Sequence, residues 1–168
     1  MNFDGKVAVI TGSSAGIGAE AAKKISALGG KVTINYSKSK EAAEEVAHEC
    51  SHLGGSPLII KSDIATDEGC KHLIDNAFSE FGAINILINN AGRTKFADHS
   101  NLDALERDDF ENILALNLNS NYELIKHARP HLAKNKKSSI VNISSVAGLR
   151  GLGSSVAYAA SKGALNSM

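Results

Sequence analysis

Two residues near the end of the sequence, Tyr158 and Lys162, have a spacing that suits acid–base chemistry. They are four positions apart, so in a helix their side chains share one face. A free tyrosine loses its proton only near pH ~10, which is too high for efficient proton transfer at neutral pH. A nearby ammonium group stabilises the phenolate, so the two residues together could act as a general acid–base unit. Taken alone, the same spacing also describes an ordinary surface tyrosine beside a lysine.

Three glycines, Gly12, Gly16 and Gly18, follow the first apolar run of the chain. Their G-x-x-x-G-x-G spacing differs from the G-x-G-x-x-G dinucleotide fingerprint. The physical needs are the same: a sharp turn, close approach of the backbone to a pyrophosphate, and close packing of a helix on a strand. The helix that follows would offer its free N–H groups to the anion. A tight turn without a ligand is the alternative interpretation.

The residues after the second apolar run bear on which dinucleotide would bind. An acidic side chain there would accept a hydrogen bond from a free ribose 2′-hydroxyl and favour NAD. The sequence instead has Ser37 and Lys38, with no acidic residue before Glu41. These two side chains could hold a 2′-phosphate, so charge favours NADP over NAD. The alternative is that Lys38 and Lys40 are solvated loop lysines.

Strand-like and helix-like segments alternate through the chain, as in proteins with a parallel sheet covered on both faces. The expected strands cover residues 6–11, 32–36, 58–61, 84–88 and 139–143. The expected helices cover residues 19–28, 40–53, 66–81 and 108–132, and a last one begins near Tyr158. We expect Pro130 to kink or end the fourth helix. The pattern predicts an α/β fold with a doubly wound, Rossmann-like parallel sheet in one domain, residues 1–168.

Four segments together resemble one family. They are the turn at residues 11–18, the run Asn89-Asn90-Ala91-Gly92, the pair Ser144-Ser145, and Tyr158 with Lys162. In this order the sequence is similar to the short-chain dehydrogenase/reductase family, most of all to 3-oxoacyl-acyl-carrier-protein reductases and bacterial sugar dehydrogenases. The resemblance covers almost the whole chain.

The resemblance implies an oxidoreductase that transfers a hydride between NADP or NAD and a carbonyl or secondary alcohol, with 3-oxoacyl thioesters among the candidate substrates. Tyr158 would exchange a proton with the substrate oxygen, and Lys162 would lower the pKa of Tyr158. Ser145 would orient the substrate oxygen, and Asn117 would support a water-linked proton relay. By strand alternation, Ser144 is expected to point elsewhere if the strand is still extended there. The residues expected to contact the cofactor are Gly12, Ser14, Ala15, Gly16, Ile17, Gly18, Ser37, Lys38, Asp63, Ile64, Asn90, Ala91, Gly92, Tyr158 and Lys162. The alternative is a non-catalytic nucleotide-binding protein or an inactive fragment of such an enzyme.

Composition excludes several other classes of protein. Eighteen Lys and Arg balance 18 Asp and Glu, whereas a nucleic-acid-binding protein would show a basic excess. No apolar run approaches a membrane span, and the N-terminus lacks a signal pattern, so we expect a cytoplasmic protein with no membrane partner. Cys50 and Cys70 are expected as small fillers in helices. His127 and His131 are four apart, but with no third ligand in view we expect surface residues and no metal site.

The length of 168 residues bears on how complete the site is. Five strands are expected, whereas the doubly wound sheet usually has six, and the last helix has barely begun where the sequence stops. We therefore expect the N-terminal two-thirds of a longer enzyme, with C-terminal strands and helices missing. The loops at residues 93–102 and 146–157 are expected to line the substrate side. The resemblance also implies a homo-oligomer, a tetramer or dimer, joined through the helix at 108–132 and the helix near Tyr158.

Overall fold

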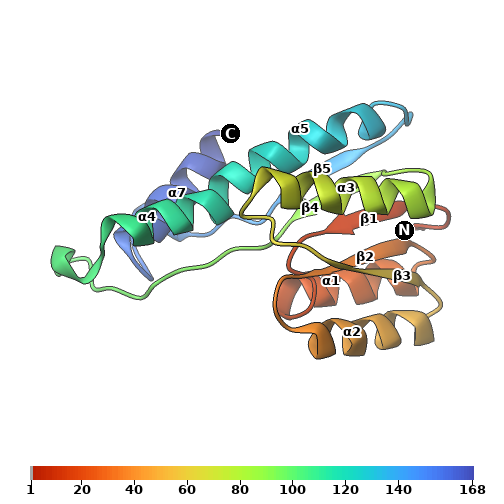
Figure 1. Cartoon of the computed structure of the whole chain (residues 1–168), viewed down its shortest axis with the longest axis horizontal. Coiled ribbons are helices and arrows are strands. Elements are labelled where there is room, and N and C mark those ends of the chain that lie inside the picture. Colours follow the sequence, from red (N-terminus) through yellow and green to blue (C-terminus); the bar gives the residue numbers. More distant parts are fainter. Residues whose placement is uncertain (1) are drawn as a thin grey trace.

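A computed structural model of the chain describes residues 2–168 (Figure 1). Its strands form one five-stranded sheet in the order β3-β2-β1-β4-β5. The strands are β1 (Val7–Ile10), β2 (Lys31–Tyr36), β3 (Ser56–Lys61), β4 (Ile86–Asn89) and β5 (Ser139–Asn142). All four neighbouring pairs run parallel, which confirms the predicted doubly wound, Rossmann-like sheet.

Helices cover both faces of this sheet. The α-helices are α1 (Gly16–Ala27), α2 (Lys40–His52), α3 (Asp67–Phe81), α4 (Arg107–Leu114), α5 (Ser120–Leu132), α6 (Ala147–Arg150) and α7 (Val156–Ser167). A short 3-10 helix, η1 (Leu102–Ala104), precedes α4, and a π-helical turn, η2 (Ala115–Asn119), joins α4 to α5. Helices α1 and α2 lie on one face of the sheet and α3 and α5 on the other, while α4, α6 and α7 gather beyond the ends of the strands (Figure 1).

The central strand β1 shows why the sheet needs both helix layers. Successive side chains of a strand point to opposite faces. Ala8 and Ile10 pack with apolar residues of α1 and α2, whereas Val9 between them packs with residues of α3 and α5. All three are fully buried. The continuous apolar run of β1 is therefore the pattern of a parallel strand buried on both sides.

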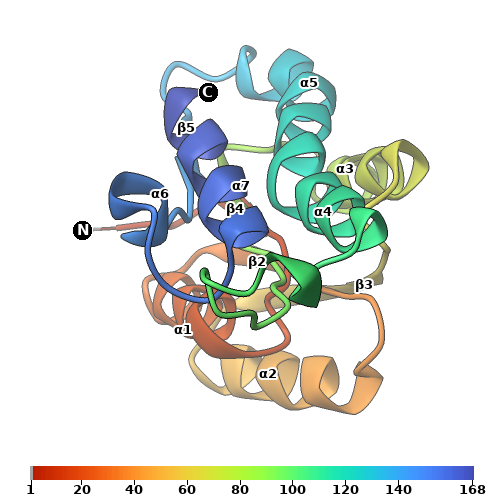
Figure 2. The same ribbon diagram turned by 90° about the vertical axis from the view of Figure 1, so that its left-hand side faces the viewer.

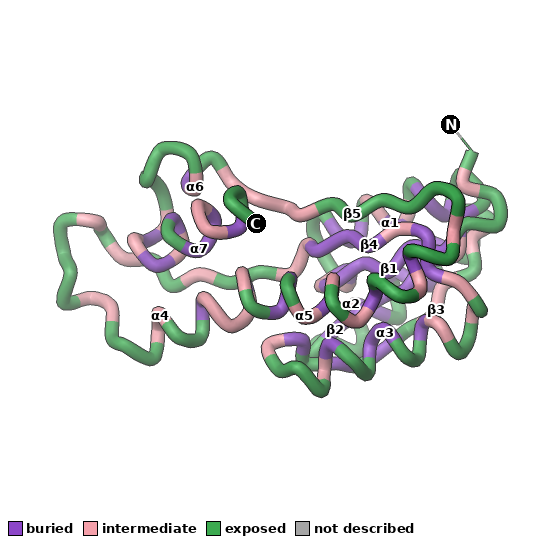
Figure 3. Tube along the Cα trace, turned by 90° about the horizontal axis from the view of Figure 1, so that it is seen from above, coloured by how far each residue is buried: buried purple, intermediate pink, exposed green. Residues whose placement is uncertain are grey.

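The two edge strands differ from this pattern. In β5, Ile140 is 44% exposed and Val141 43% exposed, and Figure 3 shows this strand on the outside of the sheet. At the other edge, β3 begins before the expected residue 58. Pro57 lies within this strand and pairs in register with Val32 of β2. An edge position tolerates proline because the missing N–H need not serve a neighbouring strand.

Several helix boundaries differ from the prediction. Helix α1 begins at Gly16 rather than at residue 19, so it includes the last two glycines of the turn. The expected helix over residues 108–132 is interrupted by the π-helical turn η2. Pro130 does not end it at once, since α5 continues for two more residues to Leu132. The expected loop at 146–157 contains the short helix α6.

Two further predictions concern the core and the membrane. Cys50 and Cys70 are both buried and unpaired, which confirms their role as small fillers. Among residues 2–168, no helix combines the length and the apolar character needed to cross a membrane.

Candidate active site

The glycine turn after β1 leaves bare backbone at the end of the strand. Gly12 and Gly16 have φ of +59° and +58°, a conformation that side-chain-bearing residues rarely adopt. A Cβ added at Gly18 would lie 2.5 Å from Asn90 Nδ2 and 2.9 Å from the carbonyl oxygen of Gly12. Helix α1 then begins after Ala15, which offers no side-chain cap, so the N–H groups of its first turn remain available to an anion.

Two buried polar residues that sequence reasoning did not assign hold this turn in place. The hydroxyl of Ser13 donates to the carbonyl oxygen of Ile10 at 2.8 Å, and Asn35 Oδ1 accepts from the N–H of Gly12 at 3.0 Å. Ser13 Oγ also accepts from the N–H of Asn35 at 2.9 Å. These bonds join the ends of β1 and β2. The only sequence signal was a small polar residue beside each apolar run.

The segment after β4 is bonded to the same turn. The N–H groups of Asn90 and Ala91 both donate to Thr11 Oγ1 at 2.9 Å. The side-chain amide of Asn90 donates to the carbonyl oxygens of Thr11 at 2.9 Å and Gly12 at 3.2 Å. The predicted run at residues 89–92 therefore lies directly against the glycine turn, at the carboxyl ends of adjacent strands.

A first hollow of about 390 Å³ lies at this edge of the sheet. Nine of the predicted cofactor residues line it: Gly12, Ser14, Ser37, Lys38, Asp63, Ile64, Asn90, Ala91 and Gly92. Residues that sequence reasoning missed also line it, namely Asn35, Ser39, Ser62, Arg93 and Leu116. Of the remaining predicted residues, Ala15, Gly16 and Gly18 lie where α1 begins.

A second hollow of about 400 Å³ adjoins the first, because Asn90 and Gly92 line both. Its walls bring together the glycine turn, the segment after β4, the end of β5 and helix α7. They are formed by Ile17, Asn90, Gly92, Thr94, Phe96, Ile143, Ser144, Ser154, Tyr158 and Lys162. Figure 2 shows α7 and α6 gathered at this end of the molecule.

Tyr158 and Lys162 lie on α7 as their spacing predicts. The helix starts at a capping hydroxyl, Ser155 Oγ, which accepts from the N–H of Tyr158 at 3.3 Å. Lys162 Nζ lies 5.8 Å from the centre of the Tyr158 ring. The ammonium group donates to the carbonyl oxygen of Ile143 at 2.7 Å, and the residue is only 4% exposed. Burial lowers the pKa of Lys162, because the charged form loses hydration.

The two serines after β5 are placed differently from the expectation. Ser144, which was expected to point elsewhere, lines the hollow with Tyr158 and Lys162. Its hydroxyl donates to Asn166 Oδ1 at 2.5 Å. Ser145 Oγ accepts from the N–H of Ala147 at 3.1 Å, at the start of α6. The chain is no longer an extended strand after Asn142, so the alternation used to orient these two side chains does not apply.

Asn117 lies in the π-helical turn η2 and is fully buried. Its Oδ1 accepts from the N–H of Arg93 at 2.8 Å. Its Nδ2 donates to the carbonyl oxygen of Arg93 at 2.9 Å and to Ser161 Oγ at 3.0 Å. Such turns often occur at functional sites. This one places a polar side chain between the loop after β4 and the helix that carries Tyr158.

His127 and His131 are half-buried between α3 and α5, not the freely exposed surface residues that were expected. Only 18% of the His127 side chain is exposed, and its Nε2 lies 2.7 Å from Asp67 Oδ1. The His131 ring packs on Phe78 with ring centres 4.0 Å apart, and burial lowers the pKa of this histidine. Both residues face α3, and the packing of α3 against α5 could not be read from the spacing within one helix.

Comparison with known proteins identifies the family. The sequence model described as short chain dehydrogenase matches residues 6–168. The chain belongs to the short-chain dehydrogenase/reductase family. It is 37% identical over 157 residues to a protein of Streptomyces violaceoruber provisionally named ketoacyl reductase 2 of the granaticin polyketide synthase. It is 32% identical over 157 residues to a 3-oxoacyl-[acyl-carrier-protein] reductase of Staphylococcus aureus. Each alignment covers 94% of this chain, and 61% and 63% of the two relatives.

Solved structures of other short-chain dehydrogenases/reductases share the fold. A metagenomic short-chain oxidoreductase in complex with NADP superposes with a TM-score of 0.90 at 31% identity, covering 98% of this chain and 73% of that one. NAD+-bound xylitol dehydrogenase superposes with a TM-score of 0.91 at 26% identity, covering 99% and 63%. One of these two structures thus contains NADP and the other NAD+.

Proposed function

We propose that this short-chain dehydrogenase/reductase transfers a hydride between a nicotinamide dinucleotide, preferably NADP, and a substrate that is a small-molecule carbonyl compound or secondary alcohol. The observation that carries the proposal is the junction of the two hollows at Asn90 and Gly92. One hollow is lined by Lys38 and Asp63, and the other by Tyr158 and Lys162. A dinucleotide extended across the junction would have its adenosine half in the first hollow and its nicotinamide half in the second.

The residues present fit such a ligand. A Cβ at Gly12 would lie 3.0 Å from Cα and Cβ of Ala91, and one at Gly92 would lie 3.3 Å from Asn117 Oδ1. Bare backbone at these positions lets the glycine turn pack against the segment after β4, and that segment against Asn117, at the wall of the two hollows. The open N-terminus of α1 suits a pyrophosphate, and Ser37 and Lys38 suit a 2′-phosphate.

Each catalytic side chain then has a distinct task. The nicotinamide ring, when bound, supplies or accepts the hydride. Tyr158 gives the proton to the substrate oxygen or takes it back. The buried ammonium of Lys162 stabilises the Tyr158 phenolate, and Ser145 donates a hydrogen bond to the substrate oxygen. Asn117 supports proton relay to Lys162 by holding the loop after β4 against α7.

The substrate class to test first is a 3-oxoacyl thioester, because the two relatives are named as reductases of ketoacyl and 3-oxoacyl groups. The family resemblance also leads us to expect a homo-oligomer, a tetramer or dimer, joined through α4, α5 and α7, and a cytoplasmic location.

The deciding experiment follows NADPH and NADH consumption with a panel of 3-oxoacyl thioesters, ketones and sugars, in the unchanged protein and in Tyr158→Phe. We expect turnover with NADPH that Tyr158→Phe abolishes, while cofactor fluorescence still reports binding. Unchanged turnover in Tyr158→Phe would overturn the proposed mechanism. Cofactor binding without turnover on any member of the panel would favour the alternative, a non-catalytic nucleotide-binding protein.

A further inference from the structure

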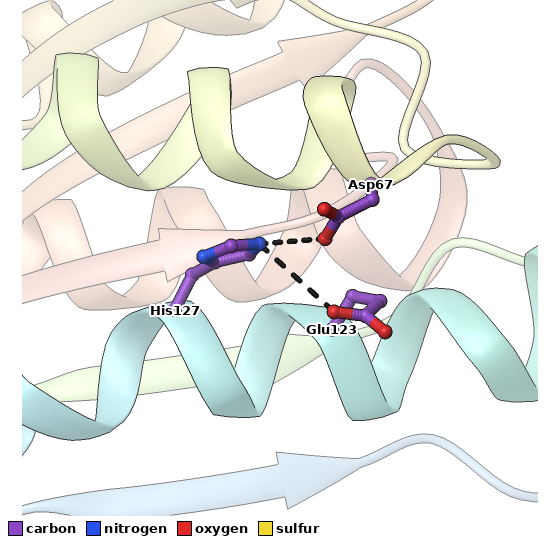
Figure 4. Close-up of side chains that lie close together, drawn as sticks. All are labelled: Asp67, Glu123 and His127. Carbon is purple, nitrogen blue, oxygen red and sulfur yellow. Dashed lines mark hydrogen bonds and ion pairs between the residues drawn. The ribbon is translucent and has the colours of Figure 1, made fainter.

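Outside the two hollows, three side chains of metal-ligand type meet between α3 and α5 (Figure 4). Asp67 is the first residue of α3. Glu123 and His127 are four apart on α5, so they project from one face of that helix. The ligand atoms of the three residues all lie within 4.8 Å of one another. Residues more than 50 positions apart in the sequence, on two different helices, therefore contribute to one cluster.

The distances within the cluster are close to those of a metal centre. His127 Nε2 lies 2.7 Å from Asp67 Oδ1 and 4.0 Å from Glu123 Oε2, and Figure 4 shows the ring edge turned toward both carboxylates. Bonds of about 2.0–2.2 Å to a divalent ion place neighbouring ligand atoms roughly 3 to 3.5 Å apart. The observed separations bracket this range, so small side-chain rotations would bring all three atoms to one ion.

The charges at this place also favour a cation. Two carboxylates face one imidazole, and the ammonium of Lys126 lies 2.8 Å from Glu123 Oε2, the same oxygen that faces His127. The thiol of Cys70 lies deeper on α3. Its pKa is raised to about 12, first by burial and then by the charges of Asp67 and Glu123. The negative potential of the two carboxylates therefore extends into the interface between α3 and α5.

We propose that Asp67, Glu123 and His127 bind one divalent transition-metal ion, with Zn²⁺ as the preferred occupant, and that this ion joins α3 to α5. One imidazole and two carboxylates form a donor set that suits Zn²⁺, whereas Mg²⁺ prefers oxygen donors alone. Water would complete the coordination. The site holds the two helices on one face of the sheet together and is lined by none of the residues of the catalytic hollow.

A second pair of histidines must be removed before the site can be measured. On α2, His48 Nε2 and His52 Nε2 lie 3.1 Å apart, and both side chains are exposed. A pair of this spacing on a helix could hold a transition metal by itself. The test therefore uses the otherwise unchanged chain carrying His48→Asn and His52→Asn, and every further variant is made in that background.

The experiment titrates the metal-free protein with ZnCl₂ by calorimetry and follows Tm in parallel. We expect one Zn²⁺ per chain and a Tm that rises with Zn²⁺ concentration, while the same concentrations of Mg²⁺ leave it unchanged. His127→Asn, Asp67→Asn and Glu123→Gln should each weaken Zn²⁺ binding at least roughly tenfold. Lys126→Gln should tighten it, because it removes the ammonium that competes for Glu123 Oε2.

Three results would overturn the proposal. The first is less than one Zn²⁺ bound per chain in the background protein. The second is a Zn²⁺ affinity that none of the three ligand substitutions changes. The third is Zn²⁺ binding that Lys126→Gln weakens. Glu123→Gln and Lys126→Gln keep the size of the side chain, so they test the site even where His127→Asn loosens the packing of α3 on α5; circular dichroism of each metal-free variant checks its fold.

Discussion

Asn117 donates its side-chain amide to Ser161 Oγ at 3.0 Å, and this bond joins the π-helical turn to the residue immediately before Lys162. Ser161 in turn donates to the carbonyl oxygen of Tyr158 at 2.7 Å. The amide of Asn117 is also bonded to both backbone groups of Arg93. One buried side chain thus fixes the loop after β4 and helix α7 relative to each other.

The first prediction tests this link with Asn117→Ala. The substitution removes the partners of the part-buried N–H and carbonyl of Arg93, so we expect the free energy of unfolding to fall by about 1–3 kcal/mol. Catalytic turnover should fall as well, because α7 and the loop after β4 lose their shared anchor. The matched control, Ser161→Ala, removes the bonds of the Ser161 hydroxyl to Asn117 and to the carbonyl oxygen of Tyr158 but leaves both backbone groups of Arg93 paired, so it should cost less, about 1 kcal/mol. Equal losses in urea unfolding of the two variants would contradict this account.

The second prediction separates the two serines after β5. If Ser145 donates to the substrate oxygen, Ser145→Ala should lower kcat/KM roughly 100-fold, as removal of one such donor does in other enzymes. Ser144→Ala should change kcat/KM less than tenfold, because the hydroxyl of Ser144 is bonded to Asn166. Steady-state kinetics with the best substrate of the panel decides. A larger loss of kcat/KM in Ser144→Ala than in Ser145→Ala would instead assign the hydrogen bond to the substrate oxygen to Ser144, which lines the hollow beside Tyr158.

The third prediction follows from the buried ammonium of Lys162. Its pKa lies below the ordinary value of 10.5, because burial disfavours the charged form. Consider pH values between the pKa of Lys162 in the folded protein and its higher pKa in the unfolded chain. In this window the unfolded chain holds more protons on Lys162, so the free energy of unfolding rises with pH. Below the window the buried charge lowers stability in full. The free energy of unfolding of Lys162→Met should therefore exceed that of the unchanged protein by the largest amount at pH 7.

The measurement for Lys162→Met is urea unfolding of both proteins without cofactor, at several pH values from 7 to 10. The advantage of the variant should shrink as the pH approaches 10.5, and its catalytic activity should be lost at every pH. Burial raises the pKa of the Cys50 and Cys70 thiols, so these groups also make stability depend on pH, and only the difference between the two proteins is diagnostic. A difference that does not change with pH would contradict the prediction.

The fourth prediction concerns the glycine turn. A methyl group at Gly18 would meet Asn90 Nδ2 at 2.5 Å and backbone of Gly12 at 2.9 Å, so Gly18→Ala must move α1 away from the segment after β4. We expect NADPH affinity, measured by fluorescence titration, to fall at least tenfold. Gly163→Ala is the control. Its Cβ would lie 3.5 Å from the carbonyl oxygen of Gly148, which is an ordinary van der Waals distance. Similar losses of NADPH binding in both variants would indicate a general effect of the added methyl.

The fifth prediction tests the preference for NADP. Lys38 lines the first hollow, whereas Lys40 does not and pairs with Glu44 at 3.1 Å on α2. If Lys38 binds a 2′-phosphate, Lys38→Ala should weaken NADPH binding roughly tenfold or more and leave NADH binding unchanged, since a hydrogen bond to a charged group contributes about 1.5–3 kcal/mol. Lys40→Ala should affect neither. Equal weakening of both cofactors by Lys38→Ala would remove this ground for choosing NADP.

The sequence by itself determined those features that depend on residues close to one another along the chain. The alternation of apolar runs with helical segments was enough for the parallel sheet, because burial on both faces makes each strand continuously apolar. The glycine turn and the pair Tyr158 and Lys162 were readable for the same reason, since turn geometry and helical spacing depend on neighbours within a few residues. Asn117 was readable as an unusual polar residue in a predicted helix interior, although the π-helical turn was not.

The tertiary structure alone decided the contacts between distant segments. The bonds of Ser13 and Asn35 that hold the turn, the position of Ser144 in the hollow, and the burial of Lys162 all depend on where separate elements meet. The same holds for His127, whose partner Asp67 is 60 residues away. The local sequence around a residue does not predict such pairs, because the packing of helices on the sheet determines which distant residues meet. The junction of the two hollows at Asn90 and Gly92 arises in this way, from strands brought side by side.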